Sequence, residues 1–320
     1  MIPPLSSRPG HDAGVRRLTS LSQQLAQAQA QIATGKKLLK PGDAPVAFAR
    51  VATLKRADAV AEAQRGAMDA AQARLSASEV ALAGIADMVM RARELALAAA
   101  NETLGVRDRA AMAAEMRELL ASARGLAETR GADGEALFAG AGTPPAYADD
   151  ADGLAAWAGL GRPPQVAIGA RLLPAGITGP EAFGVTAPLD PLAPPADPAL
   201  PPPPRERNLF DSLDHLAATL DETRPEFFRA GIDEALAALV GHGDRLAGAQ
   251  ALIGTRAARL EAEDARLDTA QLALRTDISA LEDTDLAEAV ARLDRLGVVL
   301  EAAQASFARI SRLSLWDQIR

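Results

Sequence analysis

The sequence contains no cysteine and very few aromatic residues, and these two absences limit what the protein can be. With no Cys among 320 residues, disulfide bonds, thiolate metal sites and cysteine nucleophiles are all excluded. Aromatic residues make up 3% of the chain although hydrophobic residues make up 48%, so the apolar content is mostly Ala, Leu and Val. Large enzymes usually use aromatic side chains to build their cores and pocket walls. This composition instead favours long, closely packed helices.

Two kinds of targeting segment are also missing from the sequence. No apolar run is long enough to cross a bilayer, so no membrane span is expected. Residues 1–10 have no apolar core of the kind that defines a secretory signal peptide. If the protein leaves the cell, we expect a route that reads a different signal and cleaves no signal peptide.

Charge is distributed unevenly along the chain. Residues 1–58 contain nine basic and three acidic residues, so their net charge is +6, and the remainder must carry −14 to give the total of −8. Phe48 is the only aromatic residue in the basic stretch, so no base-stacking surface is visible and no nucleic-acid partner is expected. We expect the basic segment to face acidic helices of the same assembly.

Two helical regions flank a middle region that is rich in Gly and Pro. The helical pattern covers residues 14–131 and returns from residue 208, with an irregular stretch over residues 140–205. Within that stretch, residues 165–169 and 171–173 predict short strands, and residues 188–204 predict a stiff, extended linker. The predicted fold class is mainly α: an elongated antiparallel helical bundle or coiled coil of the N- and C-terminal regions, with a small irregular or β insertion in the middle.

Apolar residues recur at every seventh position in four stretches, which is the strongest signal in the sequence. Strict sevens are typical of helices that supercoil around neighbours, because an ideal helix drifts by about 20° per heptad. The four stripes are Leu18, Leu25, Ile32 and Leu39; Met68, Leu75, Leu82, Val89 and Ala96; Leu246, Ile253, Leu260, Leu267, Leu274 and Leu281; and Leu286, Leu293, Leu300 and Phe307, accompanied by Ala289, Leu296, Ala303 and Ile310. An intramolecular bundle is the commoner fate of such stripes. Their regularity near both chain ends, where domains usually fray, favours assembly with other chains.

The heptad phase slips between the third and fourth stripes. The slip coincides with residues 282–285, and Asp285 followed by Glu288 predicts the start of a new helix. After the break at residues 40–41, Asp43 and Pro45 predict another helix start. Since the chain runs out and returns, we expect the first and last helices to be antiparallel. The last stripe must then be covered by the N-terminal stripe or by another subunit.

Residues with catalytic or ligating chemistry form no recognisable site. His11, His215 and His242 are far apart and lack ligand spacing, so no metal site is expected. Residues 34–37 resemble the end of a phosphate loop, but Lys occupies the position that needs Ser or Thr. The carboxylates of residues 282–285 lack the spacing of a calcium loop and suit a helix cap. We expect no enzyme, no catalytic residue and no cofactor, and a hydrolase with scattered residues is the weakest alternative.

Short motifs at both ends of the chain are specific when they occur together. Residues 31–45 end a helix in Thr-Gly and continue into a turn, and residues 91–116 and 134–140 supply a helical block and a closing turn. Near the C-terminus there is an Asp-x-Ala motif and a Leu-Ser-Leu-aromatic tail. The motif residues are Gly35, Asp43, Pro45, Asp285, Ala287, Leu313, Leu315 and Trp316. Together these segments resemble the flagellin-like family of bacterial flagellar proteins.

The resemblance implies a structural role in the flagellum. It implies terminal helices that become ordered in a tubular assembly, and an extracellular location. The implied partners are copies of the chain, a neighbouring hook-associated protein, flagellin, the flagellar type III export apparatus and an export chaperone. The tail favours family members at the hook–filament junction over filament flagellin, which is the alternative. A cytoplasmic coiled-coil binding module is the alternative from another class. The expected assembly interface comprises Leu18, Leu25, Ile32, Leu286, Leu293, Leu300, Phe307 and Ile310.

Five segments are expected along the chain. Residues 1–42 would form an N-terminal assembly helix and residues 43–139 the N-terminal part of a helical rod. Residues 140–205 would form a small middle domain and linker. Residues 206–283 would complete the rod, and residues 284–320 would form a C-terminal assembly helix.

Overall fold

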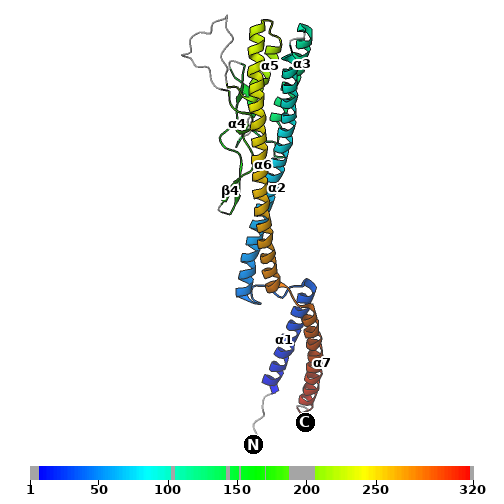
Figure 1. Ribbon diagram of the computed structural model, residues 1–320. Coiled ribbons are helices and arrows are strands. Elements are labelled where there is room, and N and C mark those ends of the chain that lie inside the picture. Colours follow the sequence, from blue (N-terminus) through cyan, green and yellow to red (C-terminus); the bar gives the residue numbers. More distant parts are fainter. Residues whose placement is uncertain are drawn as a thin grey trace. The chain divides into compact units, whose positions relative to one another are not determined.

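The computed structural model describes residues 7–101, 105–141, 145–150, 153–169, 171–186 and 206–317. Within these ranges the chain is mainly helical with a small β insertion, so the predicted fold class is confirmed (Figure 1). The helices are α1 (Ser7–Thr34), α2 (Pro45–Ala99), α3 (Val106–Ala127), α4 (Gly179–Phe183), α5 (Leu209–Leu220), α6 (Pro225–Glu282) and α7 (Leu286–Asp317). The strands are β1 (Tyr147–Asp149), β2 (Ala155–Trp157), β3 (Gln165–Ile168) and β4 (Arg171–Pro174).

The chain folds as two compact units. Unit 1 combines Met1–Ala61 with Asp268–Arg320, and unit 2 is Glu62–Leu267. Unit 1 therefore contains α1, α7, the first turns of α2 and the last turns of α6, and unit 2 contains the other described elements. The expected boundaries after residues 42, 139, 205 and 283 describe a finer division, which stays a prediction.

One continuous hydrophobic core fills unit 2. It joins the inner faces of α2, α3, α5 and α6 to the irregular segment that carries the strands. The predicted stripe of α2 and the first three residues of the α6 stripe lie at its centre, and each of these side chains is at most 3% exposed: Met68, Leu75, Leu82, Val89, Ala96, Leu246, Ile253 and Leu260. The other residues of the predicted α6 stripe are half-buried: Leu267, Leu274 and Leu281. Small residues such as Ala92 are also fully buried, so helix backbones can approach closely.

Two antiparallel hairpins form the described part of the middle region. β3 pairs with β4, with Val166 opposite Leu173, and both side chains pack against the core of unit 2. The two short strands expected here are confirmed. The pair β1–β2 was not predicted, because its strands are only three residues long and carry no alternating pattern. The linker predicted over residues 188–204 lies outside the described residues.

In unit 1, α1 and α7 lie side by side (Figure 1). Gly14, near the start of α1, lies against Phe307 near the end of α7. The end of α1 meets the start of α7, because the amide of Thr284 donates a 2.9 Å hydrogen bond to the carbonyl of Gly35. The two helices are therefore antiparallel, as expected.

Candidate assembly surface

The stripes of α1 and α7 face each other but are not fully covered. Among the residues of α1 and α7 whose side chains the structure describes, only Ala28 and Ala289 are buried, at 3% and 6% exposure. The remaining apolar positions of this seam are half-buried: Leu18, Leu21, Leu25 and Ile32 of α1, and Leu293, Leu296, Leu300 and Phe307 of α7. Two helices alone cannot enclose a seam, since each covers only one side of the other.

Helix α7 also exposes apolar side chains outside the seam. Leu286, Val290, Val298 and Val299 are between 45% and 67% exposed. A single exposed Val or Leu is ordinary, but these four lie within fourteen residues of one helix and, at about 100° per residue, on several of its sides, so much of the apolar area of α7 lies in water. Of the predicted interface residues, Leu286 therefore lies outside the α1–α7 contact, and Leu293, Leu300 and Phe307 lie in it.

The far end of the α1–α7 contact is tightly packed around an aromatic ring. A Cβ atom added to Gly14 would lie 2.6 Å from the ring of Phe307, which is closer than real Cβ contacts come. The ring of His11 lies against the same phenyl ring, with centroids 4.9 Å apart. Gly14 thus brings the backbone of α1 close to α7 at this point.

The turn after α1 contains the N-terminal motif residues. Gly35 has a positive φ of 69°, a conformation that favours glycine, and it ends the helix after Thr34. The carboxylate of Asp43 accepts hydrogen bonds from the amides of Leu39 and Lys40, at 2.9 and 3.0 Å. Helix α2 starts at Pro45. The helix start is therefore where it was expected, and Asp43 holds the turn that precedes it.

The break between α6 and α7 follows the predicted phase slip. Helix α6 ends at Glu282 and α7 begins at Leu286. The carboxylate of Asp285 accepts hydrogen bonds from the amides of Ala287 and Glu288, at 2.9 and 3.1 Å. Asp285 is therefore an N-cap, as its position suggested. The side chain of Glu288 bonds to Arg292 instead of completing a capping box.

The tail motif lies in the last turns of α7. The backbone is helical through Asp317, so Ile310, Leu313, Leu315 and Trp316 are helical residues. Their side chains lie outside the described residues, and their part in an interface stays a prediction.

Four of the few aromatic rings gather at one place in unit 2. Phe183 at the end of α4 packs against Phe138, Tyr147 of β1 and Phe210 of α5, and Tyr147 also packs against Phe210, with ring centroids 4.8 to 6.0 Å apart. The carbonyl of Phe138 accepts hydrogen bonds from the amide of Gly179 and the indole of Trp157, at 2.8 and 3.0 Å. This cluster anchors the β insertion to the helices.

A groove of about 1070 Å³ runs between α5 and α6, and its lining includes His215 and His242. The Nε2 atom of His242 lies 2.9 Å from the hydroxyl of buried Ser212. Burial, and then the charge of Arg245, lower the pKa of His242 to about 4. Burial also lowers the pKa of His215, and Arg207 lowers it further. Sequence spacing did not reveal the contact between Ser212 and His242, because it joins two helices.

The groove has no feature of a catalytic or metal centre. Ser212 and His242 are only 3% and 7% exposed, so the hydroxyl is not presented to a substrate. Within the part of the chain that the structure describes, no three His, Asp or Glu side chains are placed to hold a metal ion. Over the same residues, none of the helices has an apolar stretch suited to crossing a membrane.

Two protein-family models match this chain, one in each of its helical regions. Residues 13–143 match the family model described as the bacterial flagellin N-terminal helical region. Residues 232–317 match the model described as the bacterial flagellin C-terminal helical region. Together these regions cover about two thirds of the chain, and they include α1 and α7, which form the seam.

Individual relatives match over nearly the whole chain. The sequence is 24% identical to flagellar hook-associated protein 3 of Salmonella typhimurium, covering 98% of both chains. It is 26% identical to flagellar hook-associated protein 3 of Escherichia coli, covering 96% of both chains. A solved flagellar junction protein from Legionella pneumophila shares the fold with a TM-score of 0.55 at 15% identity, over 67% of this chain and 99% of the other.

Proposed function

Because this chain belongs to the flagellin family, we propose that it is the structural adaptor subunit at the junction between the flagellar hook and filament. Its full-length similarity to two proteins named flagellar hook-associated protein 3 supports this place in the flagellum. The match extends from the first to the last helix, so it includes the segments that would carry the assembly.

The incompletely covered seam of α1 and α7 is the observation that carries the proposal. Burying a Leu, Ile or Phe side chain contributes roughly 1.5–3 kcal/mol relative to leaving it exposed. The half-buried stripe residues and the exposed residues of α7 realise only part of this free energy in one chain. Neighbouring copies that cover the seam would supply the remainder and would offset the entropy lost when the helices become ordered.

The partners follow from a position between hook and filament. Copies of the chain would lie side by side, a neighbouring hook-associated protein would contact one side of the assembly, and flagellin would contact the other. The subunit would pass through the flagellar type III export apparatus without a cleaved signal peptide, assisted by an export chaperone. It would then be located outside the cell in the flagellum.

Substitutions at exposed positions of α7 test the proposal without disturbing the α1–α7 contact. Leu286→Asp and Val298→Asp place a charge at positions that are 54% and 67% exposed, so the free subunit should fold and be secreted normally. Covering an unpaired carboxylate costs several kcal/mol, so assembly should fail. Electron microscopy should show hooks without filaments, with flagellin released into the medium.

Leu172→Asp is the matched control, because Leu172 is 63% exposed on β4 of unit 2 and lies outside the terminal helices. Cells carrying this variant should keep their filaments. Normal filaments on cells that carry Leu286→Asp or Val298→Asp would contradict the proposal.

Filament flagellin is the second candidate, since both family models are named for flagellin. Polymerisation of the purified protein distinguishes the two functions. A filament subunit should form long filaments alone, whereas a junction subunit should stay soluble or form short rings. Cell fractionation separates both from a cytoplasmic coiled-coil module, which would stay inside the cell.

A further inference from the structure

Helix α2 carries a second stripe with seven-residue spacing, and this stripe faces water. Ala83, Met90 and Leu97 recur at every seventh position, and each directly follows a residue of the buried stripe. Met90 and Leu97 are nevertheless 64% and 54% exposed. Asp87 is also exposed, and it lies on the same side because residues three and four apart are neighbours on a helix. We call these four residues the outer stripe of α2, and their spacing is typical of a helix that packs against another helix.

The floor of the groove between α5 and α6 is lined by small residues. Ala230, Ala237, Ala238 and Gly241 of α6 belong to it. A Cβ atom added to Gly241 would meet no atom within 4 Å, so this part of the floor borders open space. Small residues allow a second helix to approach closely, and large flexible side chains fill the space above them. The groove is therefore complementary in shape to a helix that presents Met and Leu.

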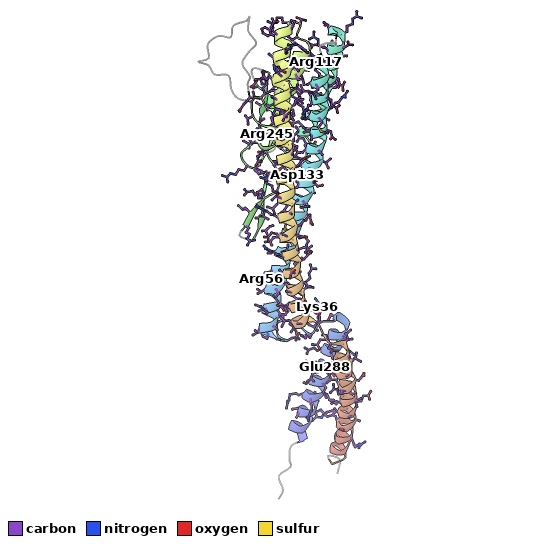
Figure 2. All side chains as sticks on the ribbon, in the orientation of Figure 1. Lys36, Arg56, Arg117, Asp133, Arg245 and Glu288 are labelled. Carbon is purple, nitrogen blue, oxygen red and sulfur yellow. The ribbon has the colours of Figure 1, made fainter. Side chains whose placement is uncertain are left out.

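Charge provides a second match between these two surfaces. Arg245, which is labelled in Figure 2, lines the groove, and Asp87 belongs to the outer stripe. Arg207 and Arg224, the other arginines of the groove, pair with glutamates of the same chain. Among the residues that the structure describes, neither Arg245 nor Asp87 has an ion-pair partner, and both are exposed. An exposed cation and an exposed carboxylate of this kind suit a contact between two chains.

The outer stripe and the groove also lie at the same level along unit 2. Helices α2 and α6 run in opposite directions (Figure 1), and an ion pair joins Nε of Arg65 to Oδ1 of Asp264 at 3.8 Å. Both helices rise about 1.5 Å per residue, so counting away from this pair places Met90 level with roughly residue 239 and Asp87 with roughly residue 242. The α6 residues of the groove span 227–245. Two copies that stand side by side at the same height would therefore bring the stripe of one to the groove of the other.

We propose that the outer stripe of α2 packs into the α5–α6 groove of a neighbouring copy of this chain. Met90 and Leu97 would cover the small residues of the floor, and Asp87 would pair with Arg245. The contact joins two different faces, so each copy offers its stripe to one neighbour and its groove to the other, as a ring requires. This inference rests on the proposed function, because it needs copies arranged side by side. It involves unit 2 alone and places no demand on the terminal helices of the free subunit.

Cross-linking in intact flagella tests the contact, because the chain has no Cys of its own. A double variant, Met90→Cys with Ala237→Cys, places one thiol on the stripe and one in the groove of every copy. Treating isolated flagella with a short bis-maleimide should then give a ladder of dimers and higher multimers of the chain on a denaturing gel. Each single variant should remain monomeric, and so should the free double variant.

Met90→Cys with Leu172→Cys is the matched control, because Leu172 is 63% exposed but lies outside the groove lining. It should give no ladder. A stripe–groove double variant that is present in flagella but forms no ladder, or a control that forms an equal one, would contradict the contact. Absence of the wild-type chain from flagella would instead contradict the proposed function, so the two proposals fail separately.

Filling the groove tests the same contact without a cross-linker. Gly241→Leu adds a side chain where a Cβ atom meets open space, so the free subunit should keep its circular dichroism spectrum and melting temperature. The amount of the chain in isolated flagella should fall at least tenfold, because the added side chain occupies the space of Met90. Gly254→Leu is the control, since Gly254 has equally open surroundings but lies about 220° around α6 from Gly241. It should be incorporated normally, and normal incorporation of Gly241→Leu would contradict the proposal.

Discussion

Most heptad residues of unit 2 are buried within one chain, whereas most heptad residues of α1 and α7 are not. Leu82 of α2 is fully buried, while Leu25 and Leu300 remain half-buried and Val298 is 67% exposed. The two regions share the same spacing and similar composition, but unit 2 supplies further elements that cover each stripe. A heptad pattern therefore specifies an apolar stripe on a helix. The number of elements packed around that stripe decides whether one chain can bury it.

The same contrast appears in the polar residues. Unit 2 buries His242, Ser212 and Arg74 among helices, and the guanidinium of Arg74 donates to the carbonyl of Ala136 at 2.9 Å. In unit 1, Lys36 and Lys55 pair with Glu282 where the terminal helices begin and end, and the seam itself is apolar. Unit 2 is thus built as a finished domain, and unit 1 as a surface that one chain leaves partly uncovered.

The largest expected difference lies between two matched core substitutions. Leu82→Ala in α2 should lower the free energy of unfolding of unit 2 by about 3 kcal/mol, because its side chain is fully buried and leaves a cavity. Leu300→Ala in α7 should lower the stability of the free subunit by less than ~1 kcal/mol, because its side chain is half-buried. Urea unfolding followed by circular dichroism measures both. Equal losses would remove the distinction between the units.

The stability of unit 2 should also depend on pH through its buried histidines. Because burial lowers the pKa of His242 to about 4 from the ordinary 6.5, the unfolded chain takes up a proton first as pH falls. Stability that is present above pH 6.5 should therefore be lost between about pH 6.5 and 4, by about 3 kcal/mol from this residue. His215, whose pKa is also lowered, adds to the loss.

Unfolding experiments at a series of pH values check this prediction. His242→Gln can still bond to Ser212 and should flatten the acid dependence of unit 2. His11→Gln is the control, because His11 is exposed in unit 1, and its acid dependence should match the wild type. An unchanged slope in His242→Gln would show that other groups dominate.

A smaller effect is expected from two Gly→Ala substitutions in the terminal helices. Gly14→Ala would push against the ring of Phe307 and should destabilise the α1–α7 contact by about 1–2 kcal/mol. Gly297→Ala meets no atom within 4 Å and should stabilise α7 by roughly 0.5–1 kcal/mol, since Ala is the better helix former. Protection of the Leu25 amide from hydrogen exchange should fall in the first variant and rise in the second. A rise in both would place α1 away from α7.

Much of the fold could be predicted from the sequence, because helices leave a periodic signal. The seven-residue spacing located the apolar stripes. The phase slip at residues 282–285 located the break between α6 and α7, where Asp285 caps the start of α7. The lysine cluster on Glu282 could not be found in this way, since its partners lie 227 and 246 positions away and only the fold brings them together. The aromatic cluster was missed for the same reason, whereas the β1–β2 hairpin was missed because its strands are only three residues long.

The interface itself was only partly predictable. The stripes identified Leu293, Leu300 and Phe307, but periodicity cannot distinguish residues that face α1 from residues that face outward. Val298 and Val299 fall outside the heptad positions, and their exposure became visible only once α1 was placed. They form the part of the surface that a single chain leaves uncovered.

The absence of cysteine allows a direct measurement of whether neighbouring subunits cover this surface. Val298→Cys and Leu286→Cys each introduce the only thiol, whose reaction rate with a maleimide reports its access to solvent. Both thiols should react rapidly in the free subunit and at least a hundredfold more slowly in intact flagella. Equal rates in the two states, or slow reaction already in the free subunit, would contradict the account.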